Sequence, residues 1–209
     1  YYLTMYNEPM VHPPEPEDLD VDGVLKGMYL LSKGPDNGGP KVQLMASGVG
    51  VPWVLEAQEL LAEDWGVSAD VWSVTSWTEL RRDGLNAEDD RLLNPDAEAR
   101  VPYVTQKMSE VEGPVVATSD FMRAVPDQIR QYVPSHFTSL GTDGYAISDT
   151  RPAARRYYHV DGPSVVTQAL ISLADTGAIS IDKAAEAARK YQLDDVTAGT
   201  SGSTEGAGA

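Results

Sequence analysis

Hydrophobic positions along this chain follow two alternating patterns, short apolar runs typical of strands and stripes of wider spacing typical of helices. The apolar runs predict strands at Gly27–Ser32, Lys41–Ser47, Ala69–Val74, Val115–Thr118 and Phe137–Leu140. The first two runs flank GPDNGGP, whose glycines, prolines and asparagine favour a turn, so these strands are predicted to form a hairpin. Strands that alternate with helices indicate an α/β domain. We therefore predict a mixed, mostly parallel sheet with the hairpin as its antiparallel member.

Apolar residues three or four positions apart predict the helices between these strands. The predicted helices cover residues 52–66, 76–93, 121–133, 164–174 and 181–191. The second is expected to be interrupted, because Gly84 and the acidic run 88–90 break its apolar stripe. Pro126 lies within the third and should occupy its first turn or kink it.

The two ends of the chain differ from the middle. Tyr1–Met5 is a β-branched and aromatic run that predicts a strand, and one strand alone cannot satisfy its backbone, so 1–8 is interpreted as the end of a preceding domain. Segment 9–22 contains several prolines and acids and no Lys or Arg, which predicts an extended linker. The main domain is then expected at 23–195. The Gly/Ala/Ser/Thr-rich tail 196–209 is expected to be disordered.

Charge and cysteine content narrow the range of functions. The chain carries 32 Asp and Glu against 16 Lys and Arg, a formal net charge of −16. Binding to nucleic acid or to anionic lipid needs concentrated positive charge, so we expect neither a nucleic-acid nor a membrane partner. The absence of cysteine excludes disulfides, thiolate metal sites and Cys nucleophiles within this chain, and we expect a cytoplasmic protein.

No motif for catalysis or metal binding stands out. Ser47–Gly50 (SGVG) lies between a strand and a helix, but neither the Lys-Ser/Thr of a phosphate loop nor the third glycine of a dinucleotide fingerprint follows, which favours a purely structural turn. The three histidines are far apart, neighbouring acids at 88–90 point apart on a helix, and we predict no metal site.

The polar segment 141–161 contains the candidate interaction residues. Arg151 and Arg155 are four positions apart, so one helical face could carry both. Charged side chains in this segment could fix the loop through ion pairs, or they could dock a partner. The candidates for either role are Asp143, Asp149, Arg151, Arg155 and His159.

Several blocks together resemble one family. YYLTMYNE, GMYLLSKG, KVQLMASGVG, DVWSVTSWTELRRDG, RVPYVTQKM, QIRQYVPSHFTSLGTDGYAISDTR and VDGPSVV occur in order, from Tyr1 to about Tyr191. They resemble the carboxy-terminal part of the homodimeric, thiamine-diphosphate-dependent pyruvate dehydrogenase component. The resemblance implies a transketolase-like C-terminal domain, a mixed sheet with helices on both faces. It also implies that residues 1–8 are the last strand of a preceding pyrimidine-binding domain.

The resemblance also implies a function for the parent enzyme, which decarboxylates pyruvate and transfers acetyl to the lipoyl group of dihydrolipoamide acetyltransferase. The family binds thiamine diphosphate and Mg²⁺ through a Gly-Asp-Gly motif that this sequence lacks, so the cofactors are expected to bind outside this segment. No catalytic residue is assigned to the segment, and alone it is predicted to be inactive, with a role in dimerisation and in shaping the cleft. Alternatives are a non-catalytic docking module for a partner subunit, or the equivalent domain of a transketolase-like enzyme.

Two residues near the start are candidates for the substrate cleft, Asn7 and Glu8. In related transketolases an Arg at this strand end helps to bind a sugar phosphate, and Asn7 stands at the corresponding place. Loss of the guanidinium fits a substrate without a phosphate, such as pyruvate, because no dianion then needs a bidentate partner.

Overall fold

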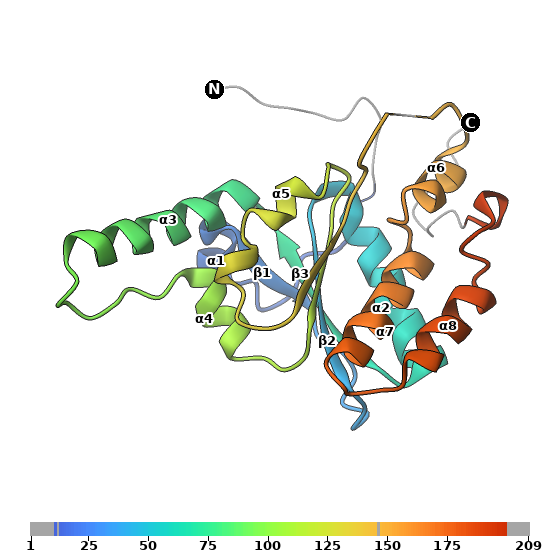
Figure 1. Ribbon diagram of the computed structural model, residues 1–209, viewed down its shortest axis with the longest axis horizontal. Coiled ribbons are helices and arrows are strands. Elements are labelled where there is room, and N and C mark those ends of the chain that lie inside the picture. Colours follow the sequence, from blue (N-terminus) through green and yellow to red (C-terminus); the bar gives the residue numbers. More distant parts are fainter. Residues whose placement is uncertain (1–10, 12, 146, 200–209) are drawn as a thin grey trace.

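A single five-stranded sheet organises the chain (Figure 1). The computed structural model describes residues 11, 13–145 and 147–199. The strand order is β1-β3-β2-β4-β5, in which β2, β3, β4 and β5 are mutually parallel and β1 alone runs antiparallel, beside β3. The prediction of a mixed, mostly parallel sheet is therefore confirmed. The strands are β1 (Met28–Ser32), β2 (Lys41–Ala46), β3 (Ser68–Val74), β4 (Val115–Thr118) and β5 (Phe137–Leu140).

The predicted hairpin between β1 and β2 is wrong. Strand β3 lies between them, pairing antiparallel with β1 and parallel with β2. The connecting turn packs against β3 and the segment before it, because the Gly34 N–H donates to Asp70 Oδ1 at 2.8 Å and Gly39 lies against the Gly66 carbonyl. The connection is longer than a tight hairpin turn, so it can pass over β3 and leave β1 as the antiparallel edge strand.

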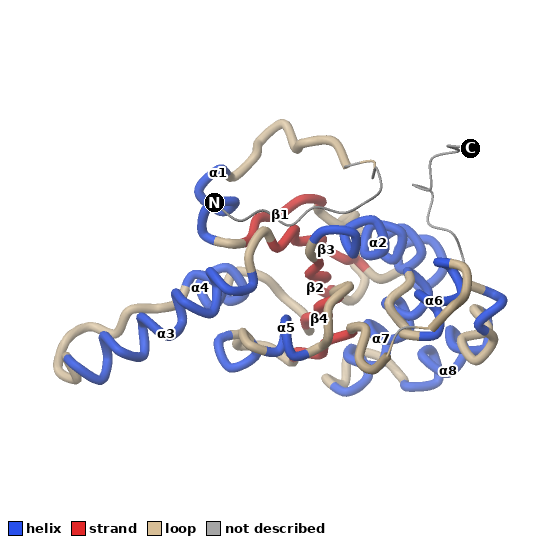
Figure 2. Tube along the Cα trace, turned by 90° about the horizontal axis from the view of Figure 1, so that it is seen from above, coloured by secondary structure: helices blue, strands red, loops and turns tan. Residues whose placement is uncertain are grey.

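Eight α-helices are present in the described residues, and they cover both faces of the sheet (Figures 1 and 2). Helices α2, α7 and α8 pack on one face, and α3, α4 and α5 lie on the other. Helices on both faces are thus confirmed. The helices are α1 (Val21–Lys26), α2 (Val51–Trp65), α3 (Trp77–Leu93), α4 (Tyr103–Ser109), α5 (Ala124–Asp127), α6 (Arg151–Tyr157), α7 (Gly162–Asp175) and α8 (Ile181–Lys190).

Each face of the sheet has its own hydrophobic core, because successive strand residues point to opposite faces. On β2, Val42 and Leu44 contribute to the core under α2 and α7, whereas Met45 contributes to the core under α3 and α4. Helix α2 begins with Pro52 in its first turn and ends at Gly66 in the left-handed region with φ 64°. The helix predicted over 52–66 is therefore confirmed to within one residue at each end.

The predicted interruption of α3 is wrong, since it is one continuous helix that begins with Ser76 as its cap. Gly84 does not break it, because the missing side chain makes room for the ring of Tyr132, whose Cε2 would lie 2.3 Å from a Cβ at position 84. The acidic run 88–90 does not break it either, because those residues are exposed and need no apolar partner.

The helix predicted over 121–133 is also wrong as a single element. The structure divides it into α5 and a 3₁₀ turn, Arg130–Tyr132, with Pro126 in the first turn of α5. Phe121 and Met122 precede α5 and are each 55% exposed, so they do not belong to the buried stripe that their spacing suggested. Helix α4 was not predicted.

Regular secondary structure begins and ends slightly outside the predicted main domain 23–195. Asp20 caps α1 by accepting from the Gly23 N–H at 2.8 Å, so the last residues of the predicted linker 9–22 are helical. Val196–Ala198 forms a 3₁₀ turn against α6, so the first residues of the predicted disordered tail are ordered. The predicted strand at 1–8 and the remainder of the tail lie outside the described residues. In the described part of the chain, no helix has the length and apolar character to cross a membrane.

Candidate functional site

Open α/β sheets bind ligands at the loops that follow the carboxyl ends of their parallel strands. The predicted structural turn after β2 forms a 3₁₀ turn, Gly48–Gly50, that leads directly into α2. Its Ser47 hydroxyl accepts a hydrogen bond from the indole N–H of Trp77 at 3.0 Å. This turn therefore joins β2 to α2 and fixes the start of α3.

The loops that follow β4 and β5 are held together by Asp143. Its carboxylate accepts from Arg123 Nε at 2.6 Å and from the Arg123 backbone N–H at 3.0 Å. The Arg123 side chain, and next its backbone N–H, hold the pKa of the Asp143 carboxyl below its usual value. The Thr142 hydroxyl also donates to the Asp120 carbonyl at 2.6 Å. Asp143 is thus placed to fix a loop, the first of the two roles considered for it.

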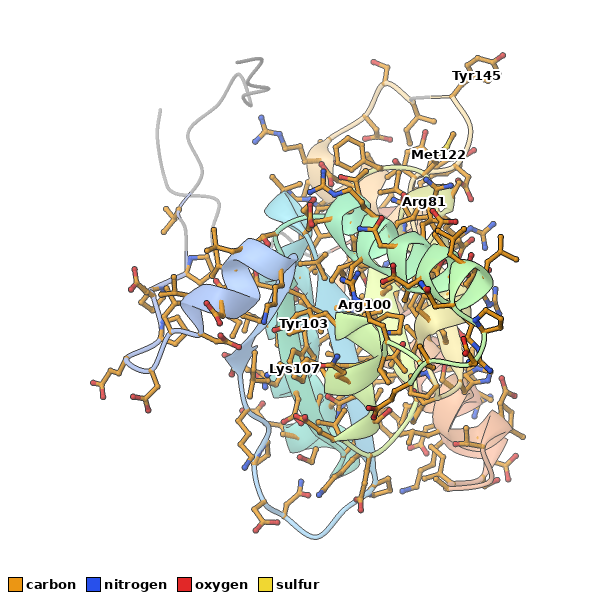
Figure 3. The ribbon with its side chains drawn as sticks, turned by 90° about the vertical axis from the view of Figure 1, so that its left-hand side faces the viewer. Arg81, Arg100, Tyr103, Lys107, Met122 and Tyr145 are labelled. Atoms are coloured by element: carbon orange, nitrogen blue, oxygen red, sulfur yellow. The ribbon has the colours of Figure 1, made fainter. Side chains whose placement is uncertain are left out.

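Large apolar side chains stand exposed beside this pair of loops. Phe121 and Met122 are each 55% exposed and Tyr145 is 97% exposed. Figure 3 shows Met122 and Tyr145 at the same end of the molecule, the end where the loops after β4 and β5 lie. Exposed apolar side chains that gather in one place are typical of surfaces that meet another polypeptide.

The other predicted residues of segment 141–161 lie on or beside α6 and form no common site. Asp149 Oδ1 accepts from the Thr150 N–H at 2.7 Å, immediately before the helix. Arg151 and Arg155 are both in α6, one turn apart, and the Arg155 guanidinium lies 5.4 Å from the centre of the Trp53 ring. His159 is exposed just after α6, with φ 55° in the left-handed region.

A buried ion pair between Arg156 and Asp161, which was not predicted from the sequence, is the central interaction of this region. Their side chains are 1% and 2% exposed, and Arg156 Nε donates to Asp161 Oδ2 at 2.8 Å. Arg156 also donates to the carbonyls of Tyr191 at 2.8 Å and Gln192 at 3.0 Å. Asp161 in turn caps α7 by accepting from the Ser164 N–H at 3.2 Å. The pair therefore joins α6, the start of α7 and the end of α8.

A local signal for Asp161 existed in the sequence, because Asp followed by Gly-Pro-Ser is a typical start of a helix. Nothing local distinguishes Arg156 from Arg155, since both follow two alanines in the same short helix. Only the return of the segment after α8 to α6 shows which arginine is enclosed.

The described residues contain no group of three or more His, Asp or Glu side chains placed to hold a metal ion. Asn7 and Glu8, the candidates for the substrate cleft, lie outside the described residues. The described part of the chain thus presents a packed scaffold with an exposed apolar rim formed by Phe121, Met122 and Tyr145.

Comparison with known families agrees with this architecture. The family model described as "Transketolase-like TK C-terminal domain" matches residues 27–161, more than half of the chain. The chain belongs to the transketolase-like C-terminal domain family. The match covers the whole sheet and ends at Asp161, so α7 and α8, which complete one face, follow the matched region.

Curated relatives of this transketolase-like domain include pyruvate dehydrogenase E1 components. The chain is 53% identical over 198 residues to the "Pyruvate dehydrogenase E1 component" of Mycolicibacterium smegmatis, covering 95% of this chain and 21% of that protein. It is 50% identical over 205 residues to the protein of the same name from Mycobacterium tuberculosis, covering 98% of this chain and 22% of that protein. The chain thus spans about a fifth of the length of these relatives, and the resemblance found in the sequence is confirmed.

Solved structures support the fold independently. Transketolase from Pichia stipitis matches with a TM-score of 0.51 at 19% identity, covering 78% of this chain and 20% of that chain. Transketolase from Leishmania mexicana matches with a TM-score of 0.50 at 17% identity, covering 78% of this chain and 20% of that chain. At these identities the likeness concerns the fold alone.

Proposed function

We propose that this chain is the C-terminal domain of a pyruvate dehydrogenase E1 component, which decarboxylates pyruvate and passes acetyl to the lipoyl group of dihydrolipoamide acetyltransferase. The identity of 53% over 95% of the chain to a protein of that name carries the proposal. The domain itself has a structural role, in which it contributes to dimer contacts and shapes the cleft. The parent is a cytoplasmic homodimer.

The cofactors of the parent, thiamine diphosphate and Mg²⁺, bind outside this segment. The sequence contains no Gly-Asp-Gly, and the described residues include no cluster of metal ligands. The groups present therefore do not fit a diphosphate-bound magnesium ion, and we assign no catalytic step to this chain. The chain instead has a positioning role, because the packed sheet holds in place the loops that carry the exposed residues Phe121, Met122 and Tyr145.

The proposal is tested with the full-length parent protein and a matched truncation that ends before residue 27. We expect the full-length protein to transfer acetyl from pyruvate to a lipoyl domain when thiamine diphosphate and Mg²⁺ are present. The truncation should bind thiamine diphosphate less well and lose most of the acetyl transfer, because it lacks the dimer contacts and the cleft wall that this domain contributes. A full-length protein that used a sugar phosphate and left pyruvate unchanged would point to the transketolase alternative and contradict the proposal.

Asn7 and Glu8 are proposed to lie at the substrate cleft of this parent enzyme. The change Asn7→Ala in the full-length protein should raise the KM for pyruvate, because it removes an amide that can hydrogen-bond the substrate. Unchanged turnover and unchanged pyruvate dependence would remove Asn7 from the cleft.

A further inference from the structure

The outer half of α3 and the segment that follows it form a projection that the fold does not need for its core. Residues 88–100 are all exposed, and the last buried residue of α3 is Ala87. Figures 1 and 2 both show α3 extending away from the sheet, with the chain returning beside it to α4. We call residues 88–101 the arm.

A cavity of about 810 Å³ opens between the arm and the body of the domain. Most of its wall is apolar, from both sides: Ala87, Leu92, Pro95, Ala99, Pro102, Val133 and Pro134. Tyr132 also lines it, with a residue exposure of 7%, and the Tyr132 hydroxyl has no hydrogen-bond partner among the described residues. Because most of its wall is apolar, the cavity is suited to receive an apolar side chain from outside the chain.

The apolar surface continues from the cavity onto the arm. Leu92 and Leu93 are 78% and 76% exposed, and Val101 is 46% exposed. Two adjacent leucines on an exposed helix point in different directions, so a small molecule in the cavity would not cover both. A polypeptide segment lying along the arm would cover both leucines and place one of its own apolar side chains in the cavity.

The charged residues of the arm indicate which charge that polypeptide segment should carry. Its cations are already engaged: Arg91 donates to the Pro95 carbonyl at 2.6 Å, and Arg100 pairs with Asp83 and, at 3.6 Å, with Asp90. The acids without a partner among the described residues are Asp89, Asp96 and Glu98. The arm carries five acids, Glu88, Asp89, Asp90, Asp96 and Glu98, against two arginines, so the field around the exposed leucines is negative. A negative field favours a basic, amphipathic partner.

We propose that the arm docks a basic, amphipathic segment of the same parent polypeptide, from the part that lies outside this chain. The relatives are about five times longer than the stretch they share with this chain, so most of the parent polypeptide is available to cover the arm. The proposal rests on the proposed function only in taking the parent to be such a long E1 component.

The test is site-specific photo-crosslinking in the full-length parent protein. A benzophenone amino acid replaces Leu92, and in a matched control it replaces Ile181, which is 55% exposed and begins α8. Helix α8 lies on the opposite side of the domain from α3 (Figure 1). Crosslinked peptides are identified by mass spectrometry, and pyruvate-dependent acetyl transfer is measured on the same samples. A second pair of proteins carries Asp89→Lys with Asp96→Lys on the arm, or Glu186→Lys with Asp194→Lys near α8.

We expect the probe at position 92 to crosslink to a Lys- or Arg-containing segment of the parent outside this chain. The charge reversal on the arm should reduce that yield about tenfold, whereas the reversal near α8 should leave it unchanged. Crosslinks to another protein, crosslinks only within this chain, or a yield no higher than at position 181 would each overturn the proposal. An enzyme that forms the expected crosslink but does not use pyruvate would instead contradict the proposed function.

Discussion

Removing the Arg156 guanidinium is the perturbation whose cost follows most directly from the structure. Arg156 is 1% exposed, pairs with Asp161 at 2.8 Å, and donates to two carbonyls at the end of α8. Changing Arg156 to Met keeps much of the volume but leaves the Asp161 carboxylate buried without its counter-charge. It also leaves two carbonyls without a donor.

Removal of one partner of a buried ion pair costs about 3–5 kcal/mol. We therefore expect Arg156→Met to lower the free energy of unfolding by about 4 kcal/mol, a shift of the melting temperature by roughly 10 °C for a domain of this size. Urea unfolding of the purified chain, followed by the fluorescence of its four tryptophans, measures this change.

The adjacent residue provides a matched control. Arg155 belongs to the same helix but is only half-buried, and its guanidinium stacks over Trp53. Arg155→Met should cost about 1 kcal/mol or less, because cation–π contacts and ion pairs that water reaches contribute little. Equal losses for the two variants would refute the view that the buried pair holds α6, α7 and α8 together.

Two further predictions concern packing and acid stability. Gly84→Ala should destabilise the domain by about 1–3 kcal/mol, because the new Cβ meets the Tyr132 ring, and in a Tyr132→Leu background the same change should stabilise α3 by up to about 1 kcal/mol; a double-mutant cycle by urea unfolding measures both. Hydrogen bonds from Lys190 and Tyr191 lower the pKa of Asp64, so its contribution is present above the usual Asp pKa and is lost as pH falls below it. Asp64→Asn should therefore flatten the fall in stability between about pH 5 and pH 3, and a slope equal to that of the unchanged chain would contradict this assignment.

Strand positions were predictable because each strand is a short apolar run between turn residues. The signal is clearest for β2 and β4, which are buried on both faces of the sheet. The pairing of the strands was harder to predict from the sequence. The pairing of β1 with β3 is accompanied by contacts of the connecting turn with Asp70 and Gly66, which lie about 30 residues further along the chain. The predicted hairpin failed for this reason.

Helix α3 and the segment after β4 show the same division between local and non-local causes. Gly84 looks like a helix breaker in isolation, but the ring of Tyr132, far along the chain, makes it a packing position. Phe121 and Met122 have the spacing of a buried stripe, yet they end in the exposed rim, because Asp143 holds the Arg123 backbone just before α5. The spacing of hydrophobic residues indicates which face of an element is apolar, but it does not indicate whether a segment of this chain packs against that face.

Titration calorimetry with thiamine diphosphate and Mg²⁺ tests the central claim most directly. The full-length parent protein should bind the cofactor, and the purified chain of 209 residues should give only the heat of dilution. Saturable binding of thiamine diphosphate by the isolated chain would place the cofactor site within these residues and would contradict the claim that this domain is a scaffold without a reactive centre of its own.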